Sequence, residues 1–374
     1  MRSILSLSFA ASAILKLSEI RILSLTLLLV LNSVIAVAAD NKCTASGEYE
    51  FVCGPQNAED LVLVAETKWI ISSGMARGAV MYLIDSQEKT WSNLYPTDSA
   101  RSRQDMETYG ACPGSPDPDN FVTHGLNIRA GVNGHSTLFV VGHGGREAIE
   151  VFDVDANNEQ PVLTWTGCVT LPEGMAANSV ASFGDGSLVV TVPLHPGYTI
   201  GDSMAGKLTG AVYAWSPGDG GFTIMQGTEL PYGNGIEVSD DGEEIYVVSS
   251  GLFSVVTFSN SNPSRQLRTT ETLAFVPDNI HWGSDGMLIT AGMVLDYPDC
   301  GSVGGAVEFD LAEFATCPRP FIASAIDPRS MESKELIRSP ANERFSNATM
   351  ALPVGEDIWI GTFSGDRIGY LSLK

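Results

Sequence analysis

The feature that most constrains the fold is a short motif that returns six times: a polar residue opens one apolar strand, and a turn leads to a second. The second strands are WIISS from Trp69, LFVVGH from Leu138, LVVTV from Leu188, IYVVSS from Ile245, LITAG from Leu288 and IWIGT from Ile358. The opening residues are Glu59, His124, Asn178, Asn234, Asp278 and Asn347. In five repeats the opening residue precedes its second strand by ten or eleven residues. Recurrence of one structural unit at a regular spacing indicates a repeat architecture.

The sequence between these motifs agrees with an all-β chain. Short apolar strands alternate with turns rich in Gly, Asp and Asn, and helical periodicity is weak. Because repeated four-stranded sheets arranged radially form a β-propeller, we predict an all-β, six-bladed β-propeller of four-stranded blades. The N- and C-terminal strands are expected to share one blade. A β-sandwich with accidental spacing is the alternative, and the regular offsets argue against it.

Radial packing would bring the start of every innermost strand to a central channel, so the opening residues should converge. Glu59 and Asp278 would supply carboxylate oxygens there, and Asn178, Asn234 and Asn279 amide oxygens. Calcium accepts 6–8 such hard ligands in flexible geometry, whereas magnesium demands octahedral order. We therefore predict a calcium-binding channel. The alternative is a plug of hydrogen-bonded polar side chains without metal, in which the two carboxylates would repel each other.

Two histidines belong to the second repeat. His124 is its opening residue, and His143 ends the paired strand in VVGHGG. A strand and its hairpin partner can bring two imidazoles to one rim, where one takes a proton from water and the other orients it. Calcium beside them would polarise an ester carbonyl. We predict His124 and His143 as catalytic residues, although each alone is more typical of a structural histidine. His281, within a predicted strand, is expected only to pack.

The N-terminal segment predicts a secretory signal peptide over residues 1–39. Basic residues precede an apolar run from Ile22 to Ala38, and the small residues of AVAAD follow. An uncleaved membrane anchor is the alternative, but the run is short for a span. Residues 40–374 contain no other segment that could cross a bilayer, and we expect them to form a single propeller domain, secreted to the extracellular space or periplasm.

Cysteine content and charge fit an exported protein. All six cysteines follow the signal, and an even number in an exported chain predicts disulfides. Nearest-neighbour pairing, one of 15 connectivities, gives the hypothesis Cys43–Cys53, Cys300–Cys317 and Cys112–Cys168. The chain has 44 acidic and 21 basic residues and a net charge of −23. Such a surface disfavours nucleic acid and anionic membranes as partners and is compatible with a neutral small-molecule substrate.

Together these residues resemble those of the calcium-dependent six-bladed propeller lactonases, both the paraoxonase/arylesterase family and the gluconolactonase/regucalcin group. The shared words are AEDLVL, HGL, VVGH, NGIEVSDDG, PDNI and IWIGT, in the same order from Glu59 onward. The resemblance implies a catalytic calcium held by Glu59, Asn178, Asn234, Asp278 and Asn279. It also implies that His124 is the base and that His143 supports it. The gluconolactonase pattern needs only the equivalents of Glu59, Asn178, Asn234 and Asp278.

Two departures from the paraoxonase pattern bear on the prediction. Ser179 stands where those proteins carry an aspartate that helps to hold a second calcium, which puts a second site in doubt although Asp60 matches. Cys53 resembles their N-terminal cysteine, but the last strand contains no cysteine to pair with it. Closure of the ring is therefore expected to depend on hydrogen bonds.

The sequence thus predicts a secreted calcium-dependent hydrolase of lactones or aryl esters, in which calcium polarises the carbonyl and a histidine activates water. No G-x-S-x-G motif occurs, which argues against an α/β-hydrolase. Two alternatives stay open. One is a non-catalytic, calcium-stabilised binding propeller, and the other is a sugar-acid lactonase that does not use the histidine pair.

Overall fold

The computed structural model describes residues 43–303 and 309–373, so the predicted signal peptide lies outside the described residues. The chain divides into two units, Met1–Thr44 and Ala45–Lys374, and the second is described here. The regular secondary structure of its described residues consists of β-strands apart from two short helices, α2 (Ile200–Met204) and α3 (Leu311–Thr316). Within the same ranges, neither helix has the length and apolar character that crossing a bilayer requires.

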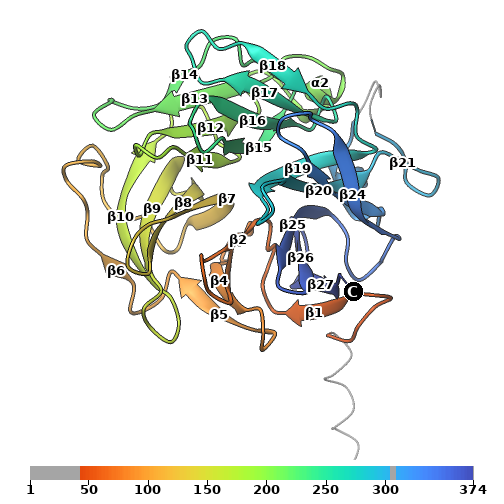
Figure 1. The fold of residues 1–374 in the computed structure, drawn as a ribbon, viewed down its shortest axis with the longest axis horizontal. Helices are drawn as coiled ribbons and strands as arrows, with labels where there is room; N and C mark the ends of the chain where they lie inside the picture. Colours follow the sequence, from red (N-terminus) through yellow and green to blue (C-terminus); the bar gives the residue numbers. More distant parts are fainter. Residues whose placement is uncertain (1–42, 304–308, 374) are drawn as a thin grey trace, which may run out of the picture. The chain divides into compact units, whose positions relative to one another are not determined.

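Six antiparallel sheets stand around a central axis as the blades of a propeller (Figure 1). The first blade holds β2 (Leu61–Leu63), β3 (Trp69–Ser72), β4 (Met81–Asp85) and β5 (Thr90–Tyr95). The second holds β7 (Phe121–Ala130), β8 (His135–Gly144), β9 (Ala148–Asp155) and β10 (Val162–Thr170), with β6 (Arg101–Ser102) parallel to β10. The third holds β11 (Val180–Ser182), β12 (Leu188–Val192), β13 (Ala211–Trp215) and β14 (Thr223–Ile224).

The other three blades repeat this order, with the innermost strand first in the chain. The fourth holds β15 (Gly233–Val238), β16 (Glu244–Ser249), β17 (Ser254–Ser259) and β18 (Gln266–Thr269). The fifth holds β19 (Phe275–Trp282), β20 (Leu288–Val294), β23 (Phe321–Ile326) and β24 (Ser333–Ser339), and the hairpin β21 (Asp296–Tyr297) and β22 (Gly301–Ser302) lies in its β20–β23 connection. The sixth holds β25 (Ala348–Val354), β26 (Asp357–Thr362), β27 (Arg367–Ser372) and β1 (Glu50–Cys53).

This architecture confirms the predicted six-bladed propeller. The six second strands expected from the repeat are β3, β8, β12, β16, β20 and β26. The ring closes in the sixth blade, where β1 pairs with β27 in antiparallel register from Glu50 opposite Tyr370 to Cys53 opposite Arg367. The Tyr370 hydroxyl also donates to Glu50 Oε2 at 2.6 Å. Hydrogen bonds therefore join the first strand to the last, as expected for a chain without a cysteine in its last strand.

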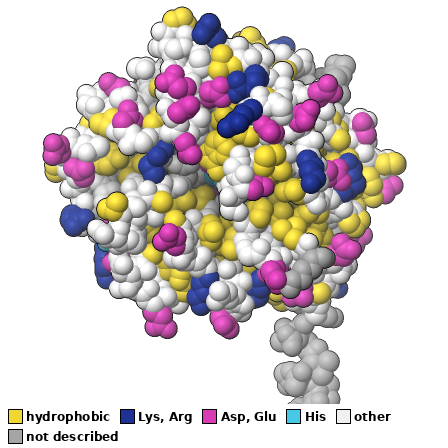
Figure 2. All heavy atoms as spheres, viewed as in Figure 1, with side chains coloured by type: hydrophobic (Ala, Val, Ile, Leu, Met, Phe, Trp, Pro, Cys, Tyr) yellow, Lys and Arg dark blue, Asp and Glu magenta, His cyan; other side chains and the backbone are white. Residues whose placement is uncertain are grey.

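The core lies between the blades, because each strand presents apolar side chains to the neighbouring sheet. Phe152 and Trp165 of the second blade, for example, pack in one cluster with Met81 and Leu83 of the first. These four side chains are at most 2% exposed. Figure 2 shows acidic and basic side chains interspersed over one face, with hydrophobic side chains exposed near its centre. Burial between blades is what holds the radial arrangement together.

Disulfides fix two of the longer connections. Cys112–Cys168, separated by 56 residues, joins the loop before β7 to β10. Cys300–Cys317, separated by 17 residues, closes the connection that leads into β23. Both pairings confirm the nearest-neighbour hypothesis. The other two cysteines are also disulfide-bonded, so none of the six is a free thiol.

Candidate active site

The opening residues of five repeats meet in one cavity of about 250 Å³. They are Glu59, His124, Asn178, Asn234 and Asp278. Asn279 adjoins them, since its Nδ2 donates to Glu59 Oε1 at 2.6 Å. The sixth opening residue, Asn347, does not line this cavity, because its amide nitrogen is bonded to Ala315 O and Ser364 Oγ. The structure therefore brings together all five predicted calcium ligands and the predicted base.

Interruptions of the strand ladder explain how these side chains reach the axis. The pairing register shifts between Thr123 and Leu126 in β7, between Gly233 and Ile236 in β15, and between Pro277 and Ile280 in β19. A β-bulge leaves its residues outside the ladder and re-aims their side chains. Each of these shifts contains a predicted site residue. The bulges therefore release these residues from the regular alternation of side chains between the two faces of the sheet.

Glycines let the bulged strands approach one another closely. A Cβ on Gly125 would lie 2.5 Å from Asn178 O, and one on Gly235 would lie 2.6 Å from Ile280 N. Side chains at these two positions would force neighbouring innermost strands apart. In the Asn234-Gly235 pair, the asparagine contributes a side chain to the site. The glycine allows the neighbouring innermost strand to approach closely.

The ligand candidates carry buried oxygens with no hydrogen-bond partner among the described residues. These atoms are Glu59 Oε2, Asn178 Oδ1, Asn234 Oδ1 and Asn279 Oδ1. All four residues are at most 5% exposed. The Asn234 amide nitrogen, in contrast, donates to Ser250 Oγ at 3.1 Å. A buried oxygen without a partner costs about 1–3 kcal/mol. Three of these residues line the cavity and Asn279 is hydrogen-bonded to Glu59, and oxygens of this kind are the donors that calcium prefers.

The charges at this point also favour a cation. Burial raises the pKa of Glu59 well above its usual range, and the negative charges of Asp60 and Asp278 add to the effect. Burial likewise raises the pKa of Asp278 to about 7, with a hydrogen bond from Asn234 acting in the opposite direction. Two carboxylates held so close resist ionisation unless a positive charge compensates them. A divalent cation would supply that charge.

The described residues hold no cluster of three or more His, Cys, Asp or Glu side chains that could bind a metal. The candidate site differs from such a cluster because only Glu59 and Asp278 contribute carboxylates. Its other oxygens come from three asparagine amides. Calcium binds neutral amide oxygens as well as carboxylates, so this set of side chains is compatible with calcium.

The two histidines form a hydrogen-bonded pair at the edge of the cavity. His124 Nδ1 lies 3.1 Å from His143 Nε2, and His124 Nε2 lies 3.8 Å from Glu59 Oε1. Burial, and then the charge of His143, lower the pKa of His124 to about 3. His124 is therefore neutral at pH 7 and keeps a lone pair for accepting a proton. Glu147, which the sequence interpretation missed, lies 2.6 Å from His143 Nδ1 through its Oε2.

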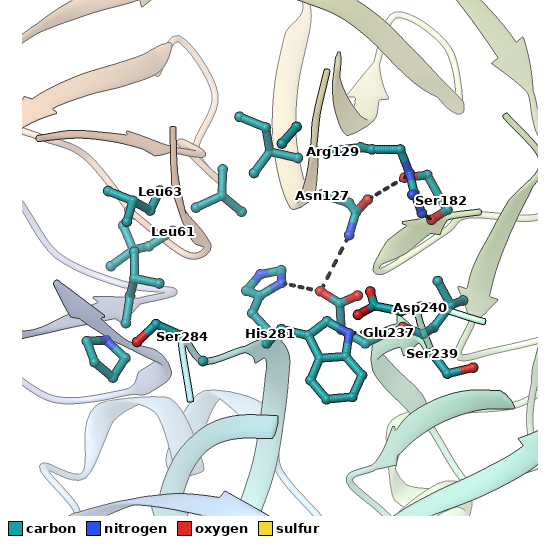
Figure 3. Close-up of a pocket in the computed structure, with 18 residues that line it drawn as sticks. Leu61, Leu63, Asn127, Arg129, Ser182, Glu237, Ser239, Asp240, His281 and Ser284 are labelled. Carbon is teal, nitrogen blue, oxygen red and sulfur yellow. Dashed lines mark hydrogen bonds and ion pairs between the residues drawn. The ribbon is translucent and has the colours of Figure 1, made fainter. Parts of the chain in front are cut away.

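His281 does more than pack, which corrects the prediction for this residue. Its Nε2 lies 2.8 Å from Asp60 Oδ1 and its Nδ1 lies 3.0 Å from Glu237 Oε1. Burial alone would lower its pKa, but the two carboxylates outweigh burial and raise it to about 10. Figure 3 shows Glu237 also approached by Asn127. The imidazolium links the first, fourth and fifth blades at a second cavity of about 480 Å³.

Apolar side chains make up most of the wall of the first cavity. They are Met75, Ile200, Met204, Val276, Met293, Val303, Phe309, Leu311, Phe314 and Phe363. Tyr232 also lines it, and its backbone φ of 49° lies in the left-handed region. Burial and the charges of Asp278 and Glu59 raise the pKa of the Tyr232 phenol above its usual range, so it stays a hydrogen-bond donor. The sequence interpretation did not single out Tyr232, although it directly precedes Gly233-Asn234.

Comparison with known proteins places the fold. No known family profile and no curated protein matches the sequence. A luciferin-regenerating enzyme superposes with a TM-score of 0.52 at 10% identity, over 87% of this chain and 94% of its own. A gluconolactonase from Xanthomonas campestris superposes with a TM-score of 0.50 at 14% identity, over 87% of this chain and 88% of its own. A calcium-binding regucalcin from Agrobacterium tumefaciens superposes with a TM-score of 0.49 at 10% identity, over 86% of this chain and 91% of its own.

At these identities the likeness is one of fold. The chain is a six-bladed β-propeller that is similar in fold to the luciferin-regenerating enzyme and to the gluconolactonase.

Proposed function

We propose that the protein is a secreted, calcium-dependent hydrolase of lactones or aryl esters. The observation that carries the proposal is the set of buried, unpartnered oxygens in or beside a largely apolar cavity that a neutral histidine also lines. The residues that would hold the calcium are Glu59, Asn178, Asn234, Asp278 and Asn279. When bound, calcium would polarise a substrate carbonyl and favour the negative charge that develops on its oxygen.

The histidine pair would supply the proton transfer. His124 Nε2 accepts a proton from water, and the hydroxide adds to the carbonyl carbon of the substrate. The C–O bond to the alcohol then breaks, and the alkoxide takes the proton back. His143 holds the His124 ring through the 3.1 Å contact to its Nδ1. Proton transfer by a positioned side chain accelerates such steps by about 10²–10⁴-fold.

The wall of the cavity favours an apolar substrate. Apolar side chains, including three methionines and three phenylalanines, line most of it. The hydroxyl groups of a sugar acid would lose their hydrogen bonds to water against such a wall, at a cost for each unpaired group. A lactone with an alkyl chain, or an aryl ester, would bury apolar surface there instead. This argues for the ester and lactone hydrolase over the sugar-acid lactonase.

Export from the cell is supported by the disulfides, because disulfides persist in oxidising compartments. The outer surface carries a net negative charge, which suits neither nucleic acid nor an anionic membrane as a partner. The proposed partner is a small neutral ester or lactone.

Hydrolysis of phenyl acetate, an alkyl-substituted γ-lactone and gluconolactone by the purified protein tests the proposal. Each substrate is assayed before chelation, after chelation, and after calcium or magnesium is restored. We expect turnover of the first two substrates that disappears with the metal and returns with calcium. Calcium-dependent thermal stabilisation without turnover of any substrate would instead identify a binding propeller. Preferential turnover of gluconolactone would identify the sugar-acid lactonase.

A further inference from the structure

The hydrogen-bonded pair of histidines continues to a third residue. Glu147 Oε2 lies 2.6 Å from His143 Nδ1, while His143 Nε2 lies 3.1 Å from His124 Nδ1. The side chains become more exposed along this line, from 16% for His124 through 21% for His143 to 38% for Glu147. The three residues therefore form a path from the buried cavity to solvent.

The turn that carries Glu147 is held in place. Gly144, at the end of β8, has a φ of 94°, and a Cβ there would lie 2.0 Å from Asn120 O in the loop before β7. The Glu147 carbonyl accepts from Leu171 N at 3.0 Å. Next to it, Arg146 Nε donates to the buried Glu150 at 2.7 Å. Because the backbone is fixed on both sides, the contact between Glu147 and His143 is set by the fold.

This contact determines which nitrogen of each imidazole carries hydrogen. A carboxylate oxygen accepts hydrogen bonds and an imidazole N–H donates them, so Nδ1 of His143 carries hydrogen toward Glu147. Nε2 of neutral His143 is then an acceptor, and Nδ1 of His124 must carry the hydrogen between the rings. The remaining nitrogen, His124 Nε2, is left with its lone pair on the side of Glu59 and the cavity.

We propose that Glu147 is a positioning residue that fixes the tautomers of both histidines and thereby makes His124 Nε2 the proton acceptor. In the proposed hydrolysis a proton leaves water for His124 Nε2, and the Nδ1 proton of His124 moves to His143 Nε2. The resulting His143 imidazolium is stabilised by the Glu147 carboxylate. The reverse transfers return a proton to the alkoxide. This inference rests on the proposed function, but the tautomers can be measured without turnover.

A third cavity, separate from the one beside His281, gives water access to the histidine pair. It has a volume of about 630 Å³, and His143 lines it together with Asp117, Arg146 and Glu150. If the Glu147 side chain is removed, a water molecule from this cavity can accept the hydrogen from His143 Nδ1. A glutamine at position 147 would behave differently from glutamate, because it lacks the negative charge and its amide group can accept from Nδ1 through oxygen or donate to Nδ1 through nitrogen, so it fixes neither tautomer.

The test compares Glu147→Gln, Glu147→Ala and Glu147→Asp with a matched control, Glu159→Gln. Glu159 is an exposed glutamate on the β9–β10 turn of the same blade. We expect E147Q and E147A both to lower kcat by about 10- to 100-fold, because neither variant fixes the tautomer or stabilises a His143 imidazolium, with E147D recovering most of the activity and KM unchanged. A merely structural role would let the isosteric glutamine keep the activity. An E147Q variant with the kcat of the wild type would overturn the proposal.

Nitrogen-15 NMR of labelled histidines provides the readout that does not need turnover. We expect the His143 signals of the wild type and of E159Q to report hydrogen on Nδ1, and those of E147Q and E147A to report a mixture of hydrogen on Nδ1 and on Nε2. Signals that are the same in the wild type and in both variants overturn the inference whether or not the protein is a hydrolase. A tautomer change in a protein without turnover supports the role of Glu147 and contradicts the proposed function alone.

Discussion

Calcium removal should make the stability of this protein fall as pH rises, and Asp278 contributes directly to this fall. Burial raises the pKa of its carboxyl from 3.8 to about 7 in the metal-free fold. The folded state therefore binds a proton that the unfolded state has already released, so stability decreases with rising pH until the carboxyl has ionised in both states, above about pH 7. Each pKa unit corresponds to 1.36 kcal/mol, which gives a total cost of about 4 kcal/mol. The raised pKa of Glu59 acts in the same direction.

The assay compares wild type with Asp278→Asn by calorimetry at pH 5 and pH 8, after chelation and desalting. The comparison cancels the pH dependence of every group that does not interact with Asp278. Loss of the Asp278 charge also lessens the rise in the pKa of Glu59, which acts in the same direction. Between these pH values the stability of D278N relative to wild type should grow by about 3 kcal/mol, since two pH units of the titration lie between 5 and 7. An unfolding entropy of about 2.1 cal/mol/K per residue over roughly 330 residues converts this to about 4 °C in Tm.

With saturating calcium the order of the two proteins should reverse, because D278N has lost a ligand that the wild type keeps. The reasoning would be refuted by a metal-free D278N protein that is no more stable than wild type at pH 8. It would also be refuted if calcium stabilised both proteins equally, since Asp278 would then not be a ligand.

Three further predictions concern separate parts of the molecule. Asn234→Ala should abolish both the calcium-dependent rise in Tm and turnover, whereas Asn158→Ala, at an exposed loop position, should change neither; an unchanged calcium response in N234A argues against the site. His124→Gln should lower kcat about 100-fold while the calcium-dependent rise in Tm stays; full activity in H124Q would point to a mechanism without the histidine pair. Replacing Cys112 and Cys168 together by serine opens a loop of 56 residues and should cost about 4 kcal/mol in denaturant unfolding, and an unchanged midpoint would contradict that role for the disulfide.

Much of the fold and part of the site could be predicted because both follow a local pattern. Strand, turn and strand recur with similar offsets, and a propeller converts that recurrence into radial symmetry. The same symmetry predicts that residues such as Asn178 and Asn234 come together, without knowledge of any contact between them. Their convergence in one cavity follows from each one opening an innermost strand, although Asn347, which opens the sixth, does not line the cavity.

The sequence by itself therefore determined the number of blades, the shared terminal blade and five of the opening residues that meet in the cavity. Only the tertiary structure decided which charges meet there. Asp60 and His281 are 221 residues apart, and strand periodicity cannot tell which side chains pair across a channel. Glu147 is close to His143 in the chain, but their contact depends on a left-handed glycine turn anchored to its surroundings. Alternation of polar and apolar residues reports which face of a strand is buried, whereas pairing across the axis depends on bulges, strand depth and the approach of neighbouring backbones.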